Sequence, residues 1–103
     1  MSGWQRTHRR YQLVYDVASD VARHGAAALT KWRRAIDAEY GGVGDFLLDA
    51  RRRWLTAVAA YSDYSAAPAA EAARRNKELR ALLDAFAEHP VLADDRLAYA
   101  QPA

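Results

Sequence analysis

Cysteine is absent from this chain of 103 residues, which excludes disulfides, zinc–thiolate sites and cysteine nucleophiles. No apolar run approaches the length that spans a bilayer. The first residues, MSGWQRTHRRYQ, also lack the continuous apolar segment of a secretory signal peptide. We therefore expect a cytoplasmic protein without membrane contact.

The sequence motifs of common enzymes are missing as well. There is no G-x-S-x-G, no P-loop and no G-x-G-x-x-G, and the Gly41–Gly44 run has neither a preceding strand nor the required lysine. Catalytic triads cannot be recognised from residue order, because they are set by geometry. A small helical enzyme or ligand-binding bundle with a polar pocket therefore stays open as an alternative.

Large apolar side chains are few, although 51% of the residues are apolar. Alanine supplies 24 of these residues, and it favours helix while burying little area. The chain is long enough for one domain with one core, spanning residues 1–103. Because large apolar side chains are few, we expect each of them to contribute strongly to the core. Some apolar surface can also be shared with a partner chain.

Helical periodicity runs through most of the chain. Thr7 is the better N-cap for the first helix, Gly25 and Gly41 end the first two helices, and Pro90 ends the last. The pattern predicts an all-α fold, a small antiparallel bundle of about four helices with short turns and a docked C-terminal tail. The predicted helices cover residues 7–24, 27–40, 43–65 and 68–88, and the apolar tail covers residues 90–103.

The third helix, the longest apolar-periodic segment, is predicted to be central. Arg51, Trp54 and Tyr61 lie at the edge of its apolar stripe, where arginine and aromatic residues are typical interface anchors. Arg52 and Arg53 have a plainer explanation, since either can pair with Asp49 at helical spacing.

Basic residues are concentrated near the N-terminus, although the net charge is only +2. Arg6, Arg9 and Arg10 cluster with Trp4, and the second helix adds Lys31, Arg33 and Arg34. Trp32 belongs to the apolar face of that helix. Such a basic surface can follow a phosphate backbone, but a dedicated nucleic-acid protein usually carries a stronger basic stripe.

Metal binding has only weak support in the sequence. Asp16, Asp20 and His24 recur every four residues, yet no second helix offers the Glu-x-x-His element of di-iron bundles. A solvated polar face with a histidine near the helix C-terminus is the favoured explanation of this spacing. We predict no metal site and no cofactor.

The first functional hypothesis is a non-enzymatic helical module for protein interaction or self-assembly, with a protein partner or a second copy as in a homodimer. The alternative is a nucleic-acid-associated accessory protein that uses the N-terminal basic surface. The candidate interaction residues are Arg51, Trp54, Tyr61, Trp32, Arg9 and Arg10.

Overall fold

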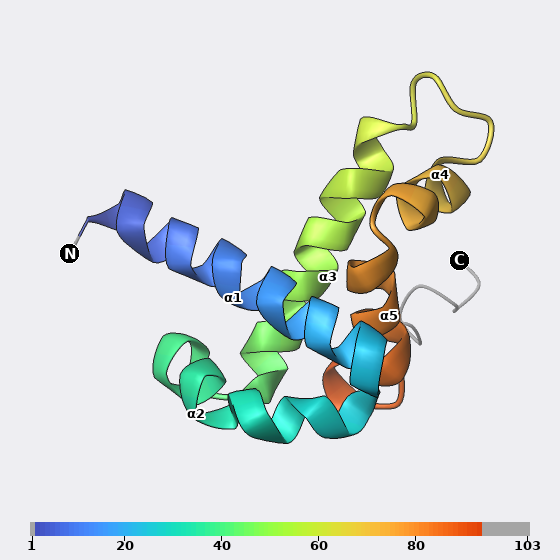
Figure 1. Ribbon diagram of the computed structural model, residues 1–103. Helices are drawn as coiled ribbons and strands as arrows, with labels where there is room; N and C mark the ends of the chain where they lie inside the picture. Colours follow the sequence, from blue (N-terminus) through green and yellow to red (C-terminus); the bar gives the residue numbers. More distant parts are fainter. Residues whose placement is uncertain (1, 94–103) are drawn as a thin grey trace.

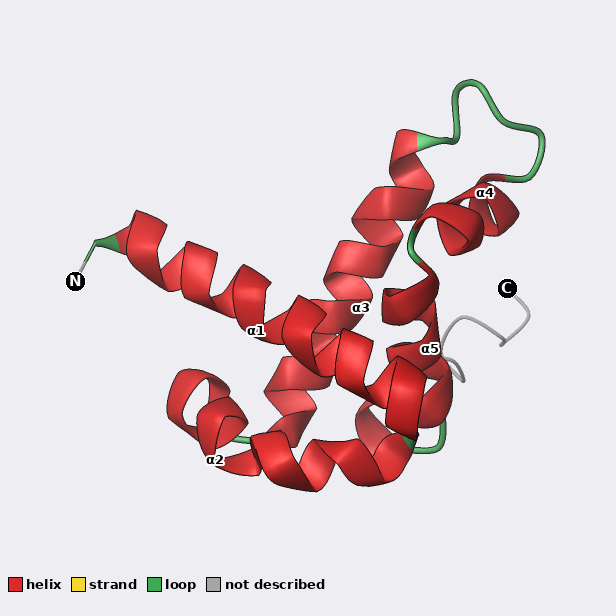
Figure 2. Ribbon diagram, in the orientation of Figure 1, coloured by secondary structure: helices red, strands yellow, loops and turns green. Residues whose placement is uncertain are grey.

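The computed structural model describes residues 2–93, and within them every regular element is helical (Figure 2). This confirms the all-α prediction. The described elements are α1 (Gly3–His24), the short 3-10 helix η1 (Ala26–Ala28), α2 (Leu29–Tyr40), α3 (Val43–Ala60), α4 (Pro68–Arg75) and α5 (Lys77–Ala85). The helices are inclined to one another (Figure 1), and the antiparallel four-helix arrangement is not confirmed.

The first helix begins earlier than predicted. Ser2, not Thr7, is the N-cap, and it forms a capping box with Gln5. The Gln5 N–H donates to Ser2 Oγ, and the Ser2 N–H donates to Gln5 Oε1, both at 3.2 Å. Two otherwise unsatisfied backbone amides are bonded in this way, so the helix includes residues 3–6, which the predicted range 7–24 left out.

The core forms where α1 packs against α5. The α1 side chains are Leu13, Val14, Val17, Ala18 and Val21, and they meet Leu79, Leu82 and Leu83 of α5. Figure 1 shows these two helices in contact at the C-terminal half of α1. The helices α2 and α3 add seven buried apolar residues to the core: Leu29, Ile36, Tyr40, Phe46, Leu47, Ala50 and Trp54. The buried residues of α1 begin at Leu13, so residues 3–12 of this helix are not among the buried residues of the core.

The structure also corrects two other predicted helices. The predicted 68–88 helix is divided at Asn76, whose side-chain amide donates to the carbonyl of Ala72 at 3.0 Å. The Asn76 backbone leaves the helical conformation, with φ −131° and ψ 53°, and its N–H donates to the same Ala72 carbonyl at 2.8 Å, so Asn76 caps the end of α4. The second part of the predicted 68–88 helix, α5, ends at Ala85 rather than at residue 88. Similarly, α3 ends at Ala60 rather than residue 65, and Ser62 Oγ donates to the Ala59 carbonyl at 2.7 Å.

The first part of the predicted tail joins the bundle. Residues 90–93 are helical, and Leu92 is buried in the core at 6% exposure. Val91 lies close to α3 at Gly44. A Cβ atom added to Gly44 would be only 3.3 Å from Val91 Cγ2. The rest of the predicted tail, residues 94–103, lies outside the described residues. Among residues 2–93, no helix is long and apolar enough to cross a membrane.

Candidate interaction surface

The N-terminal part of α1 extends beyond the helical bundle (Figure 1), and residues 3–11 are called the arm below. Every residue from Ser2 to Arg9 is exposed, and the Trp4 side chain is 73% exposed. The arm is the outer end of a helix whose other half is buried, so its helical form extends from an anchored segment. The capping box at Ser2 holds its free end.

Four aromatic rings follow one face of α1 and define an aromatic stripe: Trp4, His8, Tyr11 and Tyr15. Their spacings of four, three and four place them on one side of a helix. The Trp4 and His8 rings stack with centroids 5.3 Å apart, and Tyr11 and Tyr15 lie 4.7 Å apart. The stripe runs from the exposed tip of the arm to half-buried Tyr15, where burial and the neighbouring Tyr11 raise the tyrosine pKa.

The base of the arm is held to α2 by two of the predicted interaction residues. Arg9 Nε lies 2.7 Å from Glu39 Oε1, and Arg10 donates to the Glu39 backbone carbonyl at 2.6 Å. The Arg10 guanidinium also lies 4.5 Å from the centre of the Tyr40 ring. Arg9 and Arg10 therefore fix the direction in which the arm leaves the bundle.

A second polar network lies beneath this junction. Tyr40 donates to Asp49 Oδ2 at 2.6 Å, and Arg52 and Arg53 approach the same carboxylate at 2.5 and 3.3 Å. The predicted pairing of Arg52 and Arg53 with Asp49 is confirmed. Burial raises the pKa of Asp49, but the Tyr40 and Arg52 donors and the Arg53 charge together hold it below its ordinary value. Burial and the Asp49 hydrogen bond raise the pKa of Tyr40.

Trp32 contributes to a third network, at the turn between α1 and α2. Its Nε1–H donates to Asp20 Oδ2 at 2.8 Å, Lys31 Nζ lies 2.7 Å from that oxygen, and His24 Nε2 lies 3.7 Å from Oδ1. The Lys31 and Trp32 donors lower the pKa of Asp20. Asp20 is thus an internal acceptor, and no group of three or more His, Asp or Glu in residues 2–93 is arranged to hold a metal.

The predicted residues of α3 occupy different environments. Trp54 is a core residue at 8% exposure, and the Arg80 guanidinium lies 4.7 Å from its ring centre. Arg51 and Tyr61 are half-buried, and the Tyr61 ring meets exposed Tyr64 edge-on with centroids 5.7 Å apart. Their roles in interaction stay predictions. Because Trp54 is already covered within the chain, it is not an exposed anchor.

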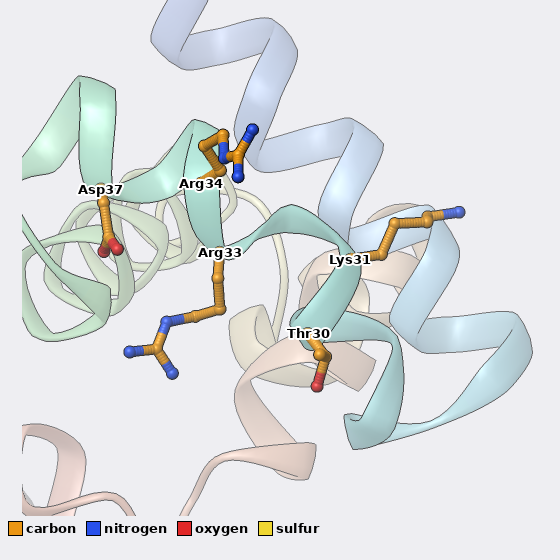
Figure 3. Close-up of a pocket in the computed structure, with 5 residues that line it drawn as sticks. All are labelled: Thr30, Lys31, Arg33, Arg34 and Asp37. Carbon is orange, nitrogen blue, oxygen red and sulfur yellow. The ribbon is translucent and has the colours of Figure 1, made fainter.

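The outer face of α2 carries the basic residues predicted for the nucleic-acid alternative. Thr30, Lys31, Arg33, Arg34 and Asp37 border an open hollow on this helix (Figure 3). Figure 3 shows Arg33 and Asp37 pointing to one side, whereas Lys31 and Arg34 point elsewhere. The cationic groups therefore diverge, and Lys31 is already paired with Asp20.

Sequence reasoning noted Trp4 beside the arginines but missed the aromatic stripe. The spacing of Trp4, His8, Tyr11 and Tyr15 is present in the sequence, but the predicted first helix begins at residue 7 and so leaves Trp4 outside it. The capping pattern Ser2-x-x-Gln5 was the clue that places these rings on a helix. No family model, curated protein or solved structure matches this chain.

Proposed function

We propose that this protein is a non-enzymatic helical interaction module and that the arm of α1 is its contact surface. The observation that carries the proposal is the exposure of the aromatic stripe, with Trp4 at 73% and Tyr11 at 51%. Exposed apolar surface of this kind is unfavourable in water, and tryptophan, tyrosine and arginine dominate the energetics of protein interfaces.

The arm is preorganised, because its conformation is already fixed in the free chain. Its helix is capped at Ser2, its outer rings are stacked, and its base is fixed by Glu39. A preorganised surface loses less conformational entropy on binding than a segment that must fold first. The buried half of α1 supplies the rigid support, because its apolar residues are part of the core.

Site-specific photo-crosslinking tests the proposal in cells of the source organism. A photoreactive phenylalanine replaces Trp4 in one variant and Tyr64 in a matched control, because both native side chains are 73% exposed. We expect discrete protein adducts from position 4 that are absent from position 64. Equal adduct patterns from the two positions would contradict a dedicated surface on the arm.

Light scattering on the purified protein then determines whether the occupant is a second copy. A homodimer that dissociates on replacement of Trp4 by alanine would identify self-assembly through the arm. A monomer across micromolar concentrations, together with adducts at position 4, would identify a different protein as the partner.

A further inference from the structure

The charged residues that accompany the aromatic stripe on α1 are all basic. Residues 2–15 include Arg6, Arg9 and Arg10 and contain no acidic residue. Arg53 of α3 adds a guanidinium 5.6 Å from the centre of the Tyr11 ring. The rings are therefore bordered by cationic groups contributed by two helices.

The carboxylates at the base of the arm do not reverse this charge. Glu39 is shared between Arg9 and Arg10, and Asp49 is shared between Arg52 and Arg53. Arg6, farther out on the arm, is exposed and has no carboxylate partner among residues 2–93. A net positive charge thus remains along the stripe.

The positive charge of the arm, and the contacts that its rings and arginines already make, argue against two possible partners: a second copy of the chain and a nucleic acid. Two copies packed arm against arm would bring the arginines of one arm against those of the other, and like charges across an interface are unfavourable. A nucleic acid requires rings with free faces and several cations available to phosphates. Here Trp4 and His8 already cover one face of each other, and Arg9 and Arg10 are engaged with Glu39.

We infer that the arm binds an acidic amphipathic helix of another protein, an inference that rests on the proposed function. The apolar face of that helix would cover Trp4 and Tyr11. Its flanking glutamates or aspartates would pair with Arg6 and lie against the net positive charge that remains where Arg9 and Arg10 share Glu39. The arm from Gly3 to Tyr11 spans about 13 Å at 1.5 Å per residue, which matches roughly two to three turns of a partner helix.

Three labelled probes test this inference by fluorescence anisotropy with the full chain. The first is a peptide of about 18 residues, five helical turns, with leucine on one face and glutamate elsewhere. The second has the same leucines with lysine in place of glutamate. The third is an oligothymidylate of about 20 nucleotides, which reports single-stranded nucleic-acid binding.

We expect the glutamate peptide to bind, to bind more weakly at high salt, and to exceed the lysine peptide in affinity by at least about tenfold. Trp4→Ala and Arg6→Glu should each weaken that binding by at least about tenfold. Arg33→Glu, which changes an exposed arginine on the outer face of α2, is the matched control and should leave it unchanged. Circular dichroism verifies that each variant retains the wild-type helix content.

Several results would overturn the inference. Equal binding of the two peptides would show a purely apolar contact, and binding of the oligothymidylate alone would identify a nucleic-acid surface. Arm-dependent dimerisation in light scattering would identify a second copy as the occupant. If no probe binds while photo-crosslinks still form from position 4, the acidic partner is wrong and the proposed interaction function stands.

Discussion

The indole Nε1–H of Trp32 donates to Oδ2 of Asp20 at 2.8 Å, and this bond joins α2 to α1 across the turn at Gly25. The same carboxylate oxygen receives Lys31 Nζ at 2.7 Å. Asp20 therefore connects two helices that are adjacent in the sequence and meet at a sharp change of direction. The Trp32 side chain, predicted as an interaction residue, has this internal role in the folded chain.

The Asp20 network predicts a pH-dependent contribution to stability. Because Lys31 and Trp32 lower the folded-state pKa of Asp20 below its ordinary 3.8, the ionised form stabilises the fold above that pH. This contribution is lost as the pH falls through the folded-state pKa. We expect Asp20→Asn to be less stable than wild type in urea at pH 7, with the difference shrinking in acid. Asp16→Asn, at an exposed position bonded to Gln12, is the control. An equal loss in both variants would show that the Asp20 network adds nothing.

Removing the Tyr40 hydroxyl tests how much its hydrogen bond to Asp49 contributes to stability. Tyr40→Phe deletes the donor to Asp49 but leaves Arg52 and Arg53 in place, so we expect a loss of about 1–2 kcal/mol. Tyr64→Phe, at an exposed ring, should change the free energy of unfolding by less than about 0.5 kcal/mol. Urea denaturation measures both values, and indistinguishable variants would contradict the predicted role of the bond.

The same bond predicts a distinct response to alkali. Tyr40 has a raised pKa, so the folded state retains its proton where an unfolded chain loses it, near 10.0. The associated stability is complete below this pH and falls as the pH rises above it. Denaturation of wild type and Tyr40→Phe at pH values between about 9 and 11 should therefore show a steeper decline in the wild type. Parallel declines would show that another group controls alkaline stability.

The two adjacent glycines at the end of α2 should respond differently to substitution by alanine. Gly41 has φ +82° and ψ −5°, the left-handed conformation that costs an L-residue about 1–2 kcal/mol. Gly42 has φ 165°, which is extended, and a Cβ there would meet no heavy atom within 4 Å. We expect Gly41→Ala to lose about 1–2 kcal/mol and Gly42→Ala to stay within about 0.5 kcal/mol of wild type in chemical denaturation. Equal losses at the two sites would argue against the left-handed turn.

Truncation of Trp54 separates core from surface on α3. Because the ring is almost fully buried, Trp54→Ala should destabilise the isolated chain by about 3–5 kcal/mol. Leu55→Ala, at the next position with 45% exposure, should cost less than about 1 kcal/mol. Thermal and urea unfolding of the monomer give both numbers. A small loss at Trp54 would show that the ring requires a partner chain for its burial.

Periodicity predicted the helices well where apolar residues and glycine breaks agreed. The turns at Gly25 and at Gly41–Gly42 are where the sequence placed them, because a positive φ at Gly25 and Gly41 ends the preceding helices. The break at Asn76 was missed, since alanine and arginine on either side favour a continuous helix. The structure shows the break in the Asn76 backbone, which has φ −131° and ψ 53°, and in the side-chain amide that caps the Ala72 carbonyl.

The candidate site was harder to predict than the helices, because burial depends on which helices meet. Trp54 and Trp4 have similar chemistry, but Arg80 of α5 lies over the first ring, whereas the second is 73% exposed. The sequence gives no direct measure of that difference. Short-range pairs such as Asp49 with Arg53 were predictable, since helical spacing alone brings them together.

The division of α1 into a buried half and an exposed arm also determines how its backbone hydrogen bonds open. Because Val17 and Val21 are buried and residues 6–9 are exposed, we expect amide protons near the valines to exchange only when the core opens and those of residues 6–9 to exchange through local opening of the outer turns. A ligand held against Trp4 would slow exchange at the outer turns and leave the inner turns unchanged. One continuous helix therefore reports occupancy of the arm and integrity of the core as two separate exchange rates.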